Sequence, residues 1–267
     1  MSQLTLKLKA APSGRIDLSG LAPAVAVGAS AAAIAQLPVG NGVRLGDVFT
    51  VSGTTGGAVT LVGSSDRIDG IGAGLASGTL VVDGDAGANA GAGMRGGMLE
   101  IHGSTGPYLA TGMKAGIVHV TGNAGDYIGG VAAGHRFGIT GGSVIIDGSI
   151  GARAGDKMRR GLILVRGTTG DACGSRMIGG TIVAEGGFGP NAGQLMRRGT
   201  LIGPKAERLP STFADCGLHE LVILSVMSRA WTRELGALAP KPLPGTVRRF
   251  AGDLATIGKG EVLITAQ

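Results

Sequence analysis

Glycine and methionine recur every nineteen residues through the middle of the chain. One glycine column has seven members: Gly78, Gly97, Gly116, Gly142, Gly161, Gly180 and Gly199. Methionine keeps the same phase, with Ile139 in its place in one longer repeat: Met94, Met113, Met158, Met177 and Met196. Because these columns stay in phase over successive units, the sequence indicates a repeat architecture in which each unit packs on the next.

Each repeat contains a short stretch whose pattern predicts a β-strand. Between Gly78 and Gly84, the apolar residues Leu80 and Val82 occupy alternate positions, and later units repeat this arrangement. A period of two places these side chains on one buried face, which a nineteen-residue unit can cover only by stacking on its neighbours. We therefore predict an all-β fold, a right-handed parallel β-helix with about 4.8 Å between coils. The methionines would form a structural ladder inside it.

Composition supports this fold and excludes others. The 267 residues include 53 glycines and are 43% hydrophobic but only 3% aromatic, so small aliphatic side chains must fill the interior. Glycine does not recur at every third position as in collagen, and the apolar content is too high for a disordered chain. A net charge of +6 with few aromatic rings is unlike a nucleic-acid-binding protein. We expect no nucleic-acid partner.

Cysteine content and the N-terminal segment favour a cytoplasmic protein. Cys173 and Cys216 are far apart and lack the spacing of metal ligands. The first ten residues lack the hydrophobic core of a signal peptide. Proline and glycine interrupt the uncharged stretch at 18–43, so we expect no membrane-spanning segment.

The repeat divides the chain into three parts. Residues 43–205 are predicted to form the β-helix, with an N-terminal cap at 1–42 and a C-terminal cap at 206–267. The caps would cover the strand edges that the open ends of a β-helix expose. Residues 57–63 are expected to form an early coil, and residues 46–53 are a candidate for another.

Both caps are expected to contain a helix. Ser30 is suited to capping a short helix that runs to Leu37. Residues 218–235 would form a helix that packs the only tryptophan against the β-helix or a partner. The apolar face of this helix has five members: Leu221, Leu224, Ser228, Trp231 and Leu235. Three prolines in 237–249 predict an extended linker to a strand-like tail.

The sequence contains no convincing catalytic, cofactor-binding or metal-binding set. Residues 91–96 match the glycine pattern of dinucleotide sites, but no long helix follows and Thr111 stands where an acidic residue is expected. His102 and His119 fall in different columns of adjacent coils, so their side chains should not stack, and no acidic or cysteine partner of the histidines stands at ligand spacing.

One column at the strand ends is polar and is expected to be a solvated outer face rather than a calcium site. Its members are Asp83, His102, Thr121, Asp147, Arg166 and Glu185.

The position after each ladder methionine is usually basic. Arg95, Lys114, Arg159 and Arg197 follow a methionine, Ile178 is the exception, and two arginines stand alongside: Arg160 and Arg198. In stacked coils these residues would line one edge, where they could contact a carboxylate-rich partner or tail. The alternative is a solvated corner whose cations pair with local Asp and Glu.

Two further features could contact a partner. The outward third strand position is apolar in four of six units, which predicts a cover formed by the C-terminal helix or by another protein: Val81, Ile145, Leu164 and Val183. The long repeat carries an insertion near residues 130–138, which must leave the coil as a loop. His135, Arg136 and Phe137 are its candidate contact residues, although the loop could equally make no contact.

The repeated motif G-x-x-M-x-x-G, followed by a strand and G-x-x-G, resembles the β-helix domain at the C-terminus of the glutamate synthase large subunit. The flanking segments resemble a narrower group. LGDVFTVSG at 45–53 and FAGDLATIGKGEVLI at 250–264 resemble the entry and closing segments of the C-subunit family of formylmethanofuran dehydrogenase. This resemblance covers nearly the whole chain.

The resemblance implies a non-catalytic scaffold subunit of a hetero-oligomer. The expected assembly is the bacterial formyltransferase/hydrolase complex, which moves a formyl group from tetrahydromethanopterin to a methanofuran-type carrier and hydrolyses it to formate. Amidohydrolase-like, formyltransferase and dehydrogenase-B-like partners would hold both carriers and a metal centre. An archaeal molybdenum or tungsten dehydrogenase with the same scaffold is the alternative. From the residues alone, a stand-alone β-helix enzyme or ligand-binding module also stays open.

Overall fold

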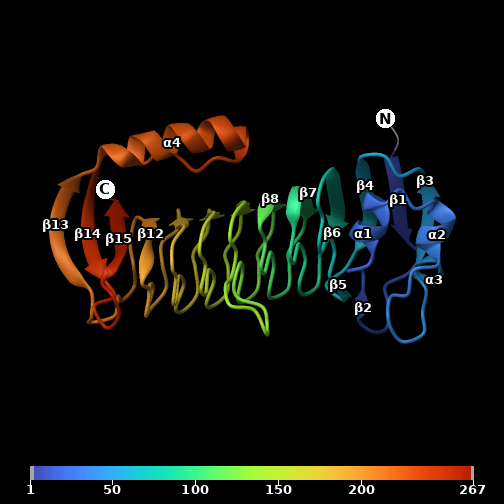
Figure 1. The fold of residues 1–267 in the computed structure, drawn as a ribbon, viewed down its shortest axis with the longest axis horizontal. Helices are drawn as coiled ribbons and strands as arrows, with labels where there is room; N and C mark the ends of the chain where they lie inside the picture. Colours follow the sequence, from blue (N-terminus) through green and yellow to red (C-terminus); the bar gives the residue numbers. More distant parts are fainter. Residues whose placement is uncertain (1–2, 266–267) are drawn as a thin grey trace.

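The structure is a computed structural model that describes residues 3–265 and shows an elongated stack of coils (Figure 1). Thirteen strands of the described chain form one sheet: β1 (Gln3–Leu8), β3 (Phe49–Gly53), β4 (Ala58–Ser64), β6 (Thr79–Gly84), β7 (Arg95–His102), β8 (Ala115–Val120), β9 (Ser143–Ile146), β10 (Leu162–Val165), β11 (Thr181–Ala184), β12 (Arg198–Gly203), β13 (Ala214–Glu220), β14 (Thr246–Gly252) and β15 (Lys259–Thr265). Their order is β13-β14-β15-β12-β11-β10-β9-β8-β7-β6-β4-β1-β3. Two shorter strands pair separately: β2 (Ile16–Asp17) and β5 (Ile68–Asp69).

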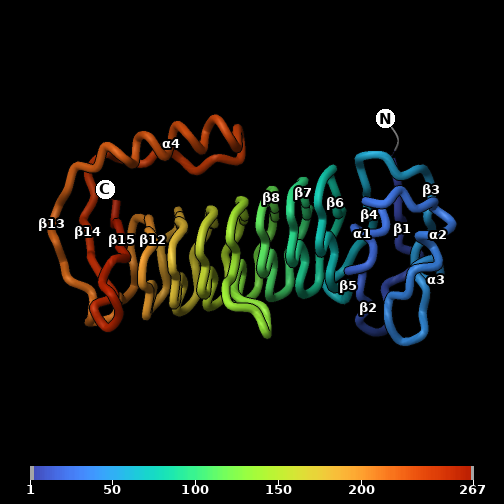
Figure 2. The backbone as a smooth tube through the Cα atoms, viewed as in Figure 1, coloured from blue at the N-terminus to red at the C-terminus, as the bar shows by residue number. Residues whose placement is uncertain are grey.

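The repeat sets the register of this sheet. Strands β6 to β12 follow one another in parallel, and Leu80 pairs with Leu99, which pairs with Val118. Across the long repeat, Val118 pairs with Val144. A second line of parallel bridges joins Ala86, Thr105, Ala124, Ile150 and Thr169. Residues one repeat apart are therefore neighbours along the stack, and each repeat makes one turn of it (Figure 2).

The methionines and glycines fit together inside the stack. All five repeat methionines have 0% exposed surface. A Cβ atom at Gly180 would lie 2.6 Å from Met158 Cε, and one at Gly199 would lie 2.8 Å from Met177 Cε. Both glycines also have positive φ, +92° and +109°, which L-residues rarely adopt. Glycine in one coil therefore leaves the space that the methionine of the preceding coil fills.

The N-terminal end of the sheet differs in part from the prediction. The early coil at 57–63 is confirmed, because β4 pairs with β6 in parallel and Ala58 stands opposite Thr79. The prediction of a further coil at 46–53 is wrong. These residues form the short helix α3 (Leu45–Val48) and strand β3, which pairs with β1 in an antiparallel manner. The chain reverses here and closes the sheet, so β1 of the expected cap lies between β3 and β4.

Two further helices complete the N-terminal region: α1 (Leu21–Ala26) and α2 (Ala31–Ala35). Ser30 caps α2, because its Oγ accepts a hydrogen bond from the Ala33 N–H at 3.2 Å. The predicted start of this helix is confirmed, and its end lies at Ala35 rather than Leu37.

The C-terminal region contains α4 (Val222–Leu235) and the short 3-10 helix η1 (Gly236–Leu238). The predicted start of the helix at 218 is wrong, because residues 218–220 belong to β13, where Leu218 pairs with Arg248. The expected extended linker reaches only to Thr246, where β14 begins. Strand β15 then runs parallel to β12, with Leu201 opposite Val262, and continues the ladder of the repeats.

Strand β13 is the last strand at the C-terminal end of the sheet, and two of its side chains contact backbone groups of the same strand. The Gly217 N–H donates to Asp215 Oδ1 at 2.9 Å, and His219 Nε2 lies 3.0 Å from the Cys216 carbonyl oxygen. An irregularity in register lies between Asp215 and Leu218. Side-chain contacts and irregularities of this kind disfavour pairing with an additional strand.

Helix α4 covers the outward face of the later coils, as predicted. Leu224 and Leu235 are buried in a second hydrophobic cluster, and Trp231 packs against it. On the sheet this cluster includes Ile145, Leu164, Val183 and Ile202. Figure 1 shows the helix lying alongside the stack. The predicted apolar column is therefore covered by this chain over β9 to β12.

Candidate functional site

The basic position after each ladder residue recurs along one edge of the stack. The Lys114 N–H donates to the Met94 carbonyl at 2.8 Å, and the Arg197 N–H donates to the Met177 carbonyl at 2.7 Å. The same bond joins Arg159 to Ile139. Thr140 and Ile178 occupy this column in the intervening coils. We use the term cationic edge for its basic residues and their two neighbours: Arg95, Lys114, Arg159, Arg160, Arg197 and Arg198.

All six side chains of the cationic edge are exposed. Within residues 3–265, none of them forms an ion pair with an Asp or Glu. Other cations of the chain are paired: Arg176 donates to Asp156 with 2.8 Å between Nε and Oδ1, and Arg249 Nε lies 2.9 Å from Glu261 Oε2. The alternative expectation, that these cations pair with local Asp and Glu, therefore does not hold for the cationic edge.

The insertion loop meets the cationic edge at Phe137. The guanidinium carbon of Arg136 lies 5.2 Å from the centre of the Phe137 ring, and that of Arg159 lies 5.0 Å from it. Both distances are typical of cation–π contacts. His135 is exposed, and its backbone N–H donates to Ala132. The loop therefore brings a further arginine beside the middle of the edge.

Side chains of the polar column at the strand ends contact the neighbouring outward column, at Glu100 and His119. Glu100 lies between two histidines, with Oε1 at 3.0 Å from His102 Nε2 and 3.9 Å from His119 Nδ1. His119 Nε2 lies 2.9 Å from Asp147, which also accepts from Arg166 Nε at 2.9 Å. His102 and His119 make no direct contact, as expected, and Glu100, the cross-strand neighbour of His119, lies between them.

Three members of this column are exposed, as expected for an outer face, and three are half-buried: Asp83, His102 and Thr121 are the exposed ones. Arg166 lies 3.7 Å from Glu185, which in turn lies 3.6 Å from Lys241. Asp147 and Glu185 therefore pair with neighbouring bases. Among the described residues, no group of three His, Cys, Asp or Glu side chains is placed to hold a metal ion.

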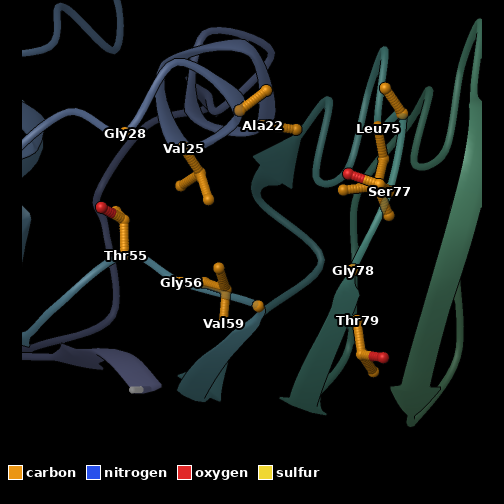
Figure 3. A pocket seen from close by; sticks show the side chains of 13 residues that line it. Ala22, Val25, Gly28, Thr55, Gly56, Val59, Leu75, Ser77, Gly78 and Thr79 are labelled. Carbon is orange, nitrogen blue, oxygen red and sulfur yellow. The ribbon is translucent and has the colours of Figure 1, made fainter. Parts of the chain in front are cut away.

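A cavity of about 350 Å³ lies between α1 and the first coils (Figure 3). Ala22, Val25, Val59 and Leu75 give it an apolar lining, and its other lining residues are Ala, Gly, Ser and Thr. No titratable side chain lines this cavity, so it offers no general acid, base or charged nucleophile.

The clearly shifted pKa values in the described chain all move away from neutrality. Burial raises the pKa of Cys173 to about 12, and the Thr169 hydrogen bond opposes this. Burial alone would raise the pKa of Asp253, but hydrogen bonds to its carboxylate hold it below the ordinary value. Ion pairing raises the pKa of Arg15, Arg176 and Arg248 and lowers that of Asp215. Acid–base catalysts instead have pKa values close to the working pH.

Helix α4 also presents apolar side chains away from the sheet. Val222 is 78% exposed, Ile223 54% and Val226 50%. No helix in the described part of the chain is long and apolar enough to span a membrane.

Comparisons with known proteins give a consistent family assignment. No family model matches the chain. The sequence is 50% identical, over 265 residues, to the C subunit of the formyltransferase/hydrolase complex Fhc of Methylorubrum extorquens, covering 98% of this chain and 99% of the relative. The structure superimposes with a TM-score of 0.92 and 38% identity on a chain in the crystal structure of that organism's formyltransferase/hydrolase complex with methylofuran, covering 98% of this chain and 100% of the other. The chain therefore belongs to the C-subunit family of the formyltransferase/hydrolase complex.

Proposed function

We propose that this chain is a non-catalytic scaffold subunit of a formyltransferase/hydrolase complex. The observation that carries the proposal is the 50% identity to the C subunit of such a complex along 98% of the chain. Two features of the chain support a structural role. The cavity between α1 and the first coils has no titratable lining residue, and the clearly shifted pKa values of the described chain move away from neutrality.

We further infer that the stack is a right-handed parallel β-helix with caps at 1–42 and 206–267. The parallel ladder from β6 to β12 and the second line of bridges support one coil per repeat. The right hand is the one that parallel crossovers adopt in nearly all proteins. Such a rod has a fixed shape, and its sides are available for holding other subunits.

In the proposed complex, a formyl group passes from tetrahydromethanopterin to an amine of a methanofuran-type carrier. Water then releases formate and regenerates the amine. The structural neighbour contains methylofuran, which supports this carrier class. We assign both steps, the carriers and a metal centre to amidohydrolase-like and formyltransferase subunits, with a dehydrogenase-B-like protein as third partner, in the cytoplasm. The relative's complex is a formyltransferase/hydrolase, which favours it over the dehydrogenase alternative.

The proposal is tested by purifying the chain from its native source through an affinity tag. We expect the other subunits to co-purify and the complex to release formate from a formylated carrier. The chain expressed alone should give no turnover. Recovery of the chain without partners, or formate release by the chain alone, would overturn the scaffold role.

A further inference from the structure

We propose that the cationic edge binds an extended, carboxylate-rich segment of a partner protein that runs parallel to the axis of the stack. The proposal rests on the scaffold role, because the partner is another subunit of the same complex. It adds the surface, the chemistry and the conformation of what is bound.

The cationic edge carries positive charge that is unpaired within the described chain. Six exposed cations lie along one edge without an acidic partner among residues 3–265, whereas Arg166, Arg176 and Arg249 elsewhere are paired. Unpaired cations in a row repel one another and attract a surface of opposite sign. Arginine also offers a planar fork that fits a carboxylate with two hydrogen bonds.

The spacing of the cations along the edge fits an extended peptide. Lys114 lies two coils from Arg159, which lies two coils from Arg197, because Thr140 and Ile178 occupy the coils between them. With about 4.8 Å between strands, these steps are about 9.6 Å each. A polyproline II segment rises about 3.1 Å per residue, so its every third side chain recurs after about 9.3 Å on the same side. Carboxylates at every third residue therefore match the three cations.

The side chains at the centre of the edge are preorganised for binding. Arg159 and Arg136 both contact the Phe137 ring, which restrains their guanidinium groups. A restrained side chain loses less entropy when it binds. Arg160 stands next in sequence and is exposed. The middle coil therefore concentrates three arginines, where the segment would be held most firmly.

The interrupted row favours a protein segment over a nucleic acid. A phosphate backbone carries a charge on every nucleotide and is bound by closely spaced cations. Here Thr140 and Ile178 leave a gap on each side of Arg159, and in this column only Arg95 and Lys114 lie in adjacent coils. The chain is also only 3% aromatic, so rings on which bases could stack are scarce.

The main test reverses four charges in the complete complex: Arg95→Glu, Lys114→Glu, Arg159→Glu and Arg197→Glu. A control variant carries the same change at four exposed cations off the edge: Lys7, Lys205, Arg208 and Arg229. We expect the edge variant to raise the dissociation constant of assembly at least tenfold in moderate salt and the control variant to change it less than threefold. Both variants should unfold at the wild-type temperature, because the substituted side chains are exposed.

Equal assembly of the two variants would overturn the proposal while the scaffold role stands. Loss of assembly in both to the same degree would also overturn it, since the effect would be one of net charge. Failure of the wild-type chain to co-purify with any subunit would instead refute the scaffold role itself.

A second test uses two twelve-residue peptides of identical composition. One repeats Glu-Pro-Pro four times, and the other places its four glutamates together. We expect the spaced peptide to bind the isolated chain at least threefold more tightly in fluorescence anisotropy, and the edge variant to remove this preference. Equal binding of both peptides, or tighter binding of a single-stranded oligonucleotide of twelve nucleotides, would contradict the inference.

Discussion

Asp253 shows how one side chain fastens the closing segment to the last coil. Its carboxylate accepts the N–H groups of Leu195 and Ala255, both at 2.8 Å, and its exposed surface is only 2%. Burial alone would raise its pKa, but these bonds and one from Thr212 outweigh burial and lower it. The charged form therefore stabilises the folded chain.

This bonding predicts a loss of stability in acid. A carboxyl group with a depressed folded pKa contributes stability above its unfolded value of about 3.9, and the contribution disappears as the pH falls through the folded value. We expect Asp253→Asn to lower the free energy of unfolding by about 1.5 kcal/mol at neutral pH. The difference from wild type should shrink below pH of about 4. Urea denaturation of both proteins at neutral pH and in acid measures this difference in the free energy of unfolding.

The exposed residue Asp171 provides the control. It accepts a hydrogen bond from Asn191 on the surface, so Asp171→Asn should change stability little at either pH. A deficit for Asp253→Asn that persists unchanged into acid would show that the charge of Asp253 is not what stabilises the fold.

Helix α4 is the element that joins the C-terminal region to the face of the stack. Its Ser228 Oγ donates to the Leu224 carbonyl and accepts the Leu243 N–H at 3.1 Å, which ties the proline-rich segment to the helix. Trp231 packs against the sheet cluster, whereas Val226 faces outward. The inner face of the helix should therefore contribute more to the stability of the fold than the outer face.

We expect Trp231→Ala to lower the free energy of unfolding by about 2 kcal/mol, less than the roughly 3–5 kcal/mol of a fully buried tryptophan because this side chain is partly exposed. Val226→Ala on the outward face is the matched control and should cost less than about 0.5 kcal/mol. Circular dichroism in denaturant measures both. Similar losses in the two variants would mean that α4 is not held to the sheet by its inner face.

The elements that follow the repeat could be predicted, and those that break it could not. Strands β6 to β12 and the covered apolar column follow from the period and the alternation of residues such as Leu80 and Val82. The reversal at β3 lies outside the repeat, because an antiparallel partner leaves no periodic trace in the sequence. Residues 218–220 also lie outside the repeat and pair with an antiparallel strand, so their sequence pattern does not distinguish the end of β13 from the start of the helix.

At the candidate site too, only features that follow the repeat could be predicted from the sequence. The column of Arg95, Lys114, Arg159 and Arg197 is visible in the sequence because it keeps the phase of the methionines. Whether each cation has an acidic partner depends on how far side chains reach between coils, which spacing alone does not give. Glu100 and His119 are one repeat apart, so their proximity follows from the columns, whereas the contact of His119 with Asp147 joins two different columns and could not be predicted in this way.

The whole molecule behaves as a stack of equivalent layers, and this predicts which deletions it tolerates. Removing residues 97–115 joins Gly96 to Gly116 and keeps every column in phase. We expect this variant to fold, with a strand-rich circular dichroism spectrum and a cooperative unfolding transition. Removing only residues 97–106 shifts the later columns relative to the earlier ones and should prevent folding. Equal damage from both deletions would refute the layered arrangement.

The contacts within β13 disfavour the addition of further strands at the C-terminal end of the sheet. A parallel stack with two open ends could go on adding strands from other copies and become a filament. Here Gly217 and Cys216 already engage side chains of their own strand, and at the opposite end the last strand, β3, runs antiparallel to its neighbour and departs from the repeat. The length of the stack is thus set by the number of repeats in this chain and not by the addition of further copies.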